Sequence, residues 1–254
     1  MKIIISPAKN MIIRSDDLFS VTTPVFLKQT KKLYDYLKKM NVDELKQVLQ
    51  ANDQIVWKHY LNYQHFDFNT QLTPAIACFQ GIQYTSISPM TFTNQQWEYV
   101  KNHVYILSAF YGVLNALDGI KPYRLEMVHP FLTDQFTSLY DFWKDQFYQE
   151  LYRNEEVVLN LCSDEYSKMV RPYVKANQKF VTVTFYEQEN QKLRQKTVYL
   201  KMARGLMVRF LAEHQIEEVE EVKKFSMLGY QYHEELSSKS NFVFVRKEKK
   251  KCYK

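Results

Sequence analysis

The sequence predicts a mixed α/β (α+β) protein that folds as a single compact domain, with a mixed central sheet flanked by helices. Strand-like and helix-like segments alternate along the chain, which is typical of this class. The chain has 254 residues, 46% of them hydrophobic, and this is long enough to bury a sizeable core. Only 5 Gly and 7 Pro leave little room for flexible linkers, so residues 1–245 are expected to form the domain.

Apolar runs and alternating stretches predict six strands, at 2–6, 103–109, 156–163, 179–187, 196–200 and 240–247. The first three are short apolar runs, as buried strands require. The segment "KFVTVTFYE" (179–187) alternates with period two, and 196–200 is expected to pair with it in a hairpin.

Apolar residues at helical spacing predict helices at 24–40, 42–50, 54–63, 94–102, 139–152, 201–213 and 217–224. Thr93 precedes the fourth of these helices, and Ser163 ends a predicted strand. Both are good N-cap residues, because a hydroxyl can accept a hydrogen bond from the first free backbone N–H groups.

Three predicted strands end in serine: "IIIS" at Ser6, "YILS" at Ser108 and "LNLCS" at Ser163. If these strands are parallel neighbours, the serines meet at the carboxyl edge of the sheet, where open α/β sheets form ligand crevices. Lys9, residues 122–126 and Asp164-Glu165 would then converge on one cleft. The alternative is that small residues simply end strands, and the sequence leaves both interpretations open.

Positive charge is concentrated in two parts of the chain. The last nine residues, "RKEKKKCYK", hold six basic residues and one acidic residue, and 246–254 is predicted to be a disordered basic tail. Between residues 166 and 212 the only acidic residues are Glu187 and Glu189. The basic residues of that segment are Lys168, Arg171, Lys175, Lys179, Lys192, Arg194, Lys196, Lys201, Arg204 and Arg209. Such segregation favours a polyanion as partner.

Several functional classes lack their motifs. No G-x-S-x-G elbow, Walker loop or G-x-G-x-x-G is present, and no histidine spacing suggests a metal site. Three distant cysteines, Cys78, Cys162 and Cys252, fit a reduced cytoplasmic protein, and "AIACF" and "LNLCS" predict that the first two are buried and unreactive. No signal peptide or membrane span is predicted. We assign no cofactor, metal or catalytic residue, and expect a monomer.

The helix "LKMARGLMVRFLAE" (200–213) places Lys201, Arg204 and Arg209 away from its apolar face. Gly205 lies among these bases, although another residue would favour a helix by about 1 kcal/mol. The missing side chain can let a phosphate approach, or it can let another helix pack closely. Together with Lys168, Arg171 and Lys175, this helix is the predicted nucleic-acid contact surface.

The stretch "SAFYGVLNALDGIKPYRLEM" (108–127) runs from a predicted strand into a turn that proline fixes. Lys121 and Arg124 lie on either side of Pro122-Tyr123, and they are expected near the rim of the cleft. Glu126 can instead hold Arg124 in an internal ion pair, so a structural role for Arg124 stays open.

Five segments in order, "ISPAKN", "LSAFYGVLNALDGIKPYRLEM", "LYDFW", "NLCSDEYSKMV" and "MARGLMVRFLAE", resemble the YaaA family of bacterial peroxide-stress proteins. The resemblance extends from residue 3 to about residue 245. It implies a cytoplasmic protein that limits iron-driven oxidation during hydrogen-peroxide stress. It also implies an α/β fold with a positively charged cleft, a helix-hairpin-helix element and DNA-binding activity.

The helix-hairpin-helix element implied by the resemblance falls on 42–50, the turn 51–53 and 54–63, although the usual turn glycines are absent. Double-stranded DNA, bound with little sequence preference, is then the expected partner. Two other classes stay open. One is an enzyme that acts on a small molecule or nucleic acid in the serine-edged cleft, and the other is an iron-handling protein.

Overall fold

A mixed sheet runs through the centre of the molecule, as seen in the computed structural model, which describes residues 1–14, 20–190 and 192–247. The strand order is β11-β12-β9-β8-β1-β5-β6, and β10 pairs with β9. The strands are β1 (Lys2–Ile5), β5 (Val104–Ser108), β6 (Gly112–Asn115), β8 (Val157–Leu161), β9 (Lys179–Glu189), β10 (Lys192–Arg194), β11 (Gln231–Tyr232) and β12 (Asn241–Lys247).

The middle of this sheet is parallel. β1 lies between β5 and β8 and pairs in parallel with both, and β8 continues in parallel to β9 and β12. The side chains of Ile3, Ile4 and Ile5 are fully buried, because helices and loops cover both faces of a central parallel strand. The three serine-ended strands are therefore parallel neighbours, which is the condition on which the expected cleft depends.

Ten α-helices are assigned in the described residues, several of them one or two turns long. They are α1 (Leu27–Lys39), α2 (Val42–Leu49), α3 (Asp53–Gln64), α4 (Ala75–Cys78), α5 (Ile82–Ile87), α6 (Asn94–His103), α7 (Leu139–Trp143), α8 (Gln146–Leu151), α9 (Asp164–Ser167) and α10 (Thr197–Glu213). Thr93 caps α6 as predicted, because its hydroxyl accepts from the backbone N–H of Gln96 while the Gln96 side chain bonds back to Thr93.

Short elements complete the chain. Two small ladders pair β2 (Asn10–Met11) with β4 (Phe79–Gln80), and β3 (Thr73–Pro74) with β7 (Gly119–Ile120). The 3-10 turns are η1 (Pro89–Thr91), η2 (Arg171–Tyr173), η3 (Val219–Lys224), η4 (Met227–Gly229) and η5 (Glu234–Leu236).

Three predicted elements are wrong in detail. The strand predicted at 196–200 is the first part of α10, and the hairpin partner of β9 is β10. The helix predicted at 139–152 is two helices, because Lys144 ends α7 with a φ of 47°. The segment 217–224 forms the 3-10 turn η3 in place of a longer α-helix.

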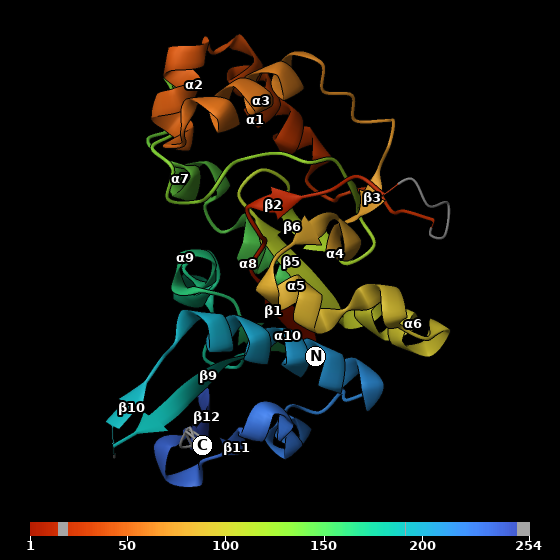
Figure 1. Cartoon of the computed structure of the whole chain (residues 1–254), viewed down its shortest axis with the longest axis vertical. Helices are drawn as coiled ribbons and strands as arrows, with labels where there is room; N and C mark the ends of the chain where they lie inside the picture. The colour runs from red at the N-terminus through yellow and green to blue at the C-terminus, as the bar shows by residue number, and fades with distance from the viewer. Residues whose placement is uncertain (15–19, 191, 248–254) are drawn as a thin grey trace, which may run out of the picture.

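Helices α1–α3 and the part of the sheet formed by β9–β12 lie on opposite sides of the molecule. In Figure 1, α1–α3 lie at the top, β9–β12 lie at the bottom, and α5, α9 and α10 lie between them. α10 packs along α5, and α6 also contacts it. The described residues form one α/β domain with a mostly parallel central sheet, as predicted.

The last strand extends past the predicted end of the domain. β12 continues through Arg246 and Lys247, past the boundary predicted at residue 245, and residues 248–254 of the predicted tail lie outside the described residues.

Among the described residues, every helix is too short or too polar to cross a bilayer.

Candidate functional site

The ends of β1 and β8 are joined through two serines. The Ser6 hydroxyl oxygen accepts a hydrogen bond from the backbone N–H of Ser163 at 2.8 Å and lies 3.2 Å from the Ser163 hydroxyl. Ser163 stands at the N-cap of α9, but its side chain makes no capping bond there, because it is used in this contact. The Tyr84 hydroxyl donates to the Ser6 carbonyl at 2.9 Å, which attaches α5 to the same edge.

A pocket of about 470 Å³ opens at this edge of the sheet. We call it the central pocket. It is lined by residues 6–10, 80–84 and 123–126, and by Ser163, Glu165, Tyr166, Lys201 and Arg204. Its location beyond the carboxyl ends of parallel strands is where open α/β sheets bind ligands.

Several residues expected in the cleft line the central pocket, among them Ser6, Lys9, Arg124, Ser163 and Glu165. Three do not. Ser108 is fully buried beneath the pocket wall, where its hydroxyl contacts the Tyr123 hydroxyl at 2.7 Å and accepts from the backbone N–H of Tyr111 at 2.8 Å. Ser108 thus fixes the position of Tyr123, which does line the pocket.

Lys121 and Asp164 also lie elsewhere. Lys121 is buried, with its ammonium 5.8 Å from the centre of the Phe66 ring, so it is not a rim residue. Asp164 is exposed and forms ion pairs with Lys168 and Arg171, each at 3.1 Å. The neighbouring carboxylate, that of Glu165, enters the pocket instead, because successive residues in the first turn of α9 point in different directions.

Glu126 is the centre of a charged cluster in the pocket wall. Its carboxylate lies 2.9 Å from the Lys9 ammonium and 3.0 Å from the Arg124 guanidinium, and the His129 ring is 3.5 Å away. Burial raises the pKa of Glu126, but hydrogen bonds from His129 and Lys9 and the charge of Arg124 outweigh it and hold the pKa at about 2. The ion pair with Arg124 that the sequence left open is formed.

Glu165 shares this wall but has the opposite shift. Burial, together with the nearby charge of Glu126, raises the pKa of Glu165. One of its carboxyl oxygens accepts a hydrogen bond from the backbone N–H of Met127 at 3.0 Å. The central pocket therefore contains one carboxylate held ionised and a second whose proton is held more tightly than usual.

Arg204 of α10 lines the central pocket, and its Nε is buried and has no hydrogen-bond partner among the described residues. Burial lowers the pKa of this guanidinium. Gln83 faces the same pocket from α5, is only 7% exposed, and leaves its amide nitrogen unpartnered within the described part of the chain. No sequence pattern indicated Gln83, because its place in the pocket depends on how α5 packs against α10.

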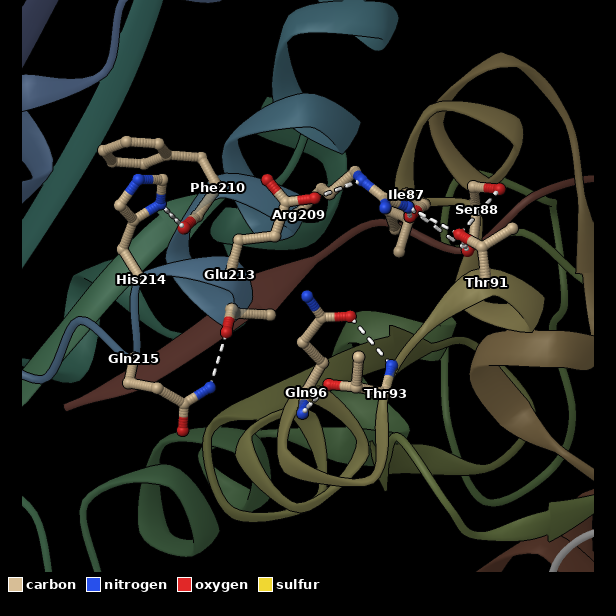
Figure 2. A network of polar contacts seen from close by, with 11 residues as sticks. Ile87, Ser88, Thr91, Thr93, Gln96, Arg209, Phe210, Glu213, His214 and Gln215 are labelled. Atoms are coloured by element: carbon tan, nitrogen blue, oxygen red, sulfur yellow. Dashed lines mark hydrogen bonds and ion pairs between the residues drawn. The ribbon is translucent and has the colours of Figure 1, made fainter.

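Arg209 does not join this surface. Figure 2 shows its side chain pointing from α10 toward α5 and η1. Its guanidinium donates to the Thr91 hydroxyl at 2.8 Å and to the Ile87 carbonyl at 3.3 Å, and its Nε pairs with Glu213 at 2.7 Å. These bonds give Arg209 a structural role, which corrects its predicted place among the nucleic-acid contacts.

Gly205 is buried against α5. A Cβ added there would overlap the carbonyl oxygen of Gln83 and lie 2.7 Å from the Ser86 Cβ. Of the two alternatives from the sequence, close helix packing is the one found, and Gly205 is closed to a phosphate. The predicted continuous surface of Lys168, Arg171, Lys201, Arg204 and Arg209 is thus divided between surface, pocket and helix interface.

Both cysteines in the described residues are buried, as predicted. Burial raises the pKa of the Cys78 thiol to about 12, and it raises the pKa of the Cys162 thiol further. Cys252 lies outside the described residues. Over 1–14, 20–190 and 192–247, no three His, Cys, Asp or Glu side chains stand close enough together to hold a metal ion.

The helices of the expected helix-hairpin-helix element are present as α2 and α3, which contact each other. The turn between them, residues 50–52, uses Gln50 in the left-handed region at φ 44°, and the Asn52 side chain accepts from the Ile55 N–H. The Asn52 side chain thus occupies one of the free N–H groups at the start of α3, which leaves one fewer for a phosphate. DNA binding by the hairpin stays a prediction.

Comparison with known proteins gives this chain relatives of matching length. The model of the family described as peroxide stress protein YaaA matches residues 1–236. A UPF0246 protein of Agathobacter rectalis is 42% identical over 97% of this chain and 99% of its own length. UPF0246 proteins of Desulfitobacterium hafniense and Ligilactobacillus salivarius are each 43% identical over 97% of this chain and at least 98% of their own length. The chain therefore belongs to the YaaA family of peroxide stress proteins.

Proposed function

We propose that the protein binds double-stranded DNA through contacts to phosphates, with little sequence preference, as part of the peroxide-stress response. The resemblance described above implies that this activity serves to limit iron-driven oxidative damage. One observation carries the proposal: most cations between residues 166 and 212 form no ion pair with a carboxylate of the described residues.

The only two carboxylates of that segment are occupied. Glu187 pairs with Arg246, and Glu189 pairs with Lys196. Lys168 and Arg171 share the single charge of Asp164. Exposed cations of this segment that form no ion pair with a described residue are Lys175, Lys179, Lys192, Arg194 and Lys201. A surface of this kind attracts the DNA backbone, because each neutralised phosphate releases a bound counterion.

The proposed contact set therefore differs from that predicted by sequence. Lys168, Arg171, Lys175 and Lys201 stay in it, and the β10 cations Lys192 and Arg194 join it. Arg209 and Gly205 leave it because both are used in helix packing. Arg204 is set apart, since it lines the central pocket.

The test is the salt dependence of binding to a duplex of random sequence. The double variant Lys175→Gln/Lys192→Gln removes two exposed positive charges. It should weaken binding to all sequences alike and reduce the slope of log K against log salt by about 1.8, which corresponds to two lost phosphate contacts. Fluorescence anisotropy over a series of salt concentrations measures this slope.

The matched control is Lys32→Gln/Lys39→Gln, which makes the same charge change on α1. In Figure 1 this helix lies at the opposite end of the molecule from β10. The control should keep the slope of the natural protein. If the two double variants reduce the slope equally, binding depends on net charge alone. That result would contradict a defined DNA surface.

A second candidate function is an enzyme that acts in the central pocket. It is favoured by Glu126 and Glu165, because two carboxyl groups with opposite pKa shifts in one pocket are the usual arrangement for acid and base roles. Mass spectrometry of the protein purified under native conditions distinguishes the candidates. A stoichiometric bound metabolite would support this second candidate.

A further inference from the structure

Two residues that line the central pocket carry hydrogen-bond donors without an acceptor in the described part of the chain. The Nε of Arg204 and the amide nitrogen of Gln83 are both buried, and neither has an acceptor among the described residues. Leaving buried donors unpaired costs free energy, and a buried guanidinium without an anion costs more. Two such donors, on residues that line one cavity, indicate an acceptor that comes from outside the chain.

The fold holds these two donors in place. α5 carries Gln83 and α10 carries Arg204, and the two helices pack closely where Gly205 meets the Gln83 carbonyl. A second cation, Lys201, lines the pocket one helical turn before Arg204 and is exposed. The donors are therefore preorganised, and they combine positive charge with a neutral amide, which suits an oxyanion.

The remainder of the pocket limits what the oxyanion belongs to. Its volume of about 470 Å³ is within the range of small-molecule sites, roughly 300–1,000 Å³. Tyr84, Tyr123 and Tyr166 supply aromatic walls. Glu126 and Glu165 line the same cavity, and their carboxyl groups repel a continuous phosphate backbone but accept bonds from amino, amide or hydroxyl groups.

We propose that the central pocket binds a small organic molecule that carries one phosphate or carboxylate group. The oxyanion lies against Arg204 and Gln83, and hydrogen-bond donors of the same molecule face Glu126 and Glu165. This site lies beside the proposed DNA surface, and it does not depend on DNA binding.

The experiment is calorimetric titration of the natural protein at low salt with four probes. Adenosine 5′-monophosphate and inorganic phosphate test a phosphate group, glutamate tests a carboxylate group, and adenosine lacks an oxyanion. At least one anionic probe should bind, and more tightly than adenosine. Arg204→Gln should weaken that binding by about 10- to 100-fold, because a hydrogen bond to a charged group is lost. Gln83→Leu should weaken it less.

The control is Lys175→Gln, which also removes one positive charge but lies outside the pocket. It should change probe affinity less than 2-fold while it weakens DNA binding, and Arg204→Gln should show the reverse pattern. Urea unfolding of each variant confirms that it is folded. The proposal is overturned if no anionic probe binds the natural protein at millimolar concentration, or if Arg204→Gln binds as tightly as the natural protein. Failure of DNA binding alone would remove only the preceding proposal.

Discussion

At the scale of single residues, Arg204 and Arg209 show how position on one helix decides what an arginine does. Arg209 has partners for its guanidinium on α10, α5 and η1, while the Nε of Arg204 is buried without one. Arg204→Met should therefore stabilise the ligand-free protein by about 1 kcal/mol, because an unpaired charge is removed. Arg209→Met should destabilise it by about 1–3 kcal/mol, because the Thr91 and Ile87 acceptors lose their donor.

Urea unfolding of both arginine variants, without phosphate in the buffer, measures this difference. The two variants should change the free energy of unfolding in opposite directions. If both variants lose stability to the same extent, then Arg204 is held by contacts of the protein, and the argument for an external anion loses its energetic basis.

Glu126 gives a pH dependence with a defined sign. Its pKa is about 2 in the folded protein against 4.5 ordinarily, so its ionised form stabilises the fold. This contribution, on the order of 2–3 kcal/mol, is fully present above pH 4.5 and is lost as the pH falls through about 2. The natural protein should therefore exceed Glu126→Gln in stability at pH 7, and the difference should disappear toward pH 2.

Denaturant unfolding of the two proteins from pH 7 to pH 2 follows this difference. The matched control is Glu235→Gln, an exposed carboxylate for which the structure shows no ion pair with a described residue. If the difference in stability between the natural protein and Glu126→Gln stays constant over this range, the cluster around Glu126 stabilises the fold through packing and not through charge.

Sequence could find those site residues that follow from strand ends. Ser6 and Ser163 were predicted to meet because parallel neighbouring strands share one edge, and their hydrogen bond is observed. Gln83 was missed, since which side chain of a short helix enters a cavity depends on how that helix packs, whereas Glu165 was expected in the cleft and does line it. Lys121 was misplaced for the same reason: a lysine beside a proline turn can cover a buried ring as readily as it faces water.

At the scale of elements, the interface of α5 and α10 decides the shape of the central pocket. In an isolated helix, Gly205→Ala would be favourable by about 1 kcal/mol. Here the added methyl group overlaps the Gln83 carbonyl, which is backbone and cannot rotate away. Gly205→Ala should therefore cost about 1–3 kcal/mol and displace Gln83 from the pocket. Chemical denaturation measures the cost, and a variant more stable than the natural protein would refute the close packing.

Elements were predictable where local pattern and tertiary environment agree. The run of isoleucines in β1 and the alternation in β9 specify strands in any context, and both are observed. The segment 196–200 has β-branched and aromatic residues that favour a strand, yet it begins α10. Phe210, Leu211 and other apolar residues later in α10 are buried, and their packing outweighs a weak local preference over the first turn.

At the scale of the whole molecule, the exposed cations and the carboxylates of the central pocket are separated. The α/β core places the exposed cations of 166–212 around β9, β10 and η2, while the pocket collects its carboxylates from the segments after β7 and β8. Neither arrangement is visible in the net charge of +6. Both proposals depend on this separation: DNA binding needs the exposed cations, and the proposed ligand needs a cavity whose carboxylates disfavour a phosphate backbone.

A buried ion pair between Glu187 and Arg246 joins the last strand, β12, to β9. Glu187 of β9 is 1% exposed, and its carboxylate accepts from the Arg246 guanidinium at 2.6 Å and from the Tyr230 hydroxyl at 2.5 Å. The guanidinium also stacks over the Tyr199 ring at 3.8 Å, so this contact joins β9, β12 and the start of α10.

Arg246→Met should destabilise the protein by about 3–5 kcal/mol, because the buried charge of Glu187 loses its counterion. The double variant Glu187→Gln/Arg246→Met should recover much of that loss, since it leaves no buried charge behind. Thermal and urea unfolding of the two single variants and the double variant give the coupling free energy, which should exceed about 1 kcal/mol. If the losses of the single variants add up to the loss of the double variant, β12 is held by its backbone pairing and its apolar face, and the ion pair contributes little to closing the sheet.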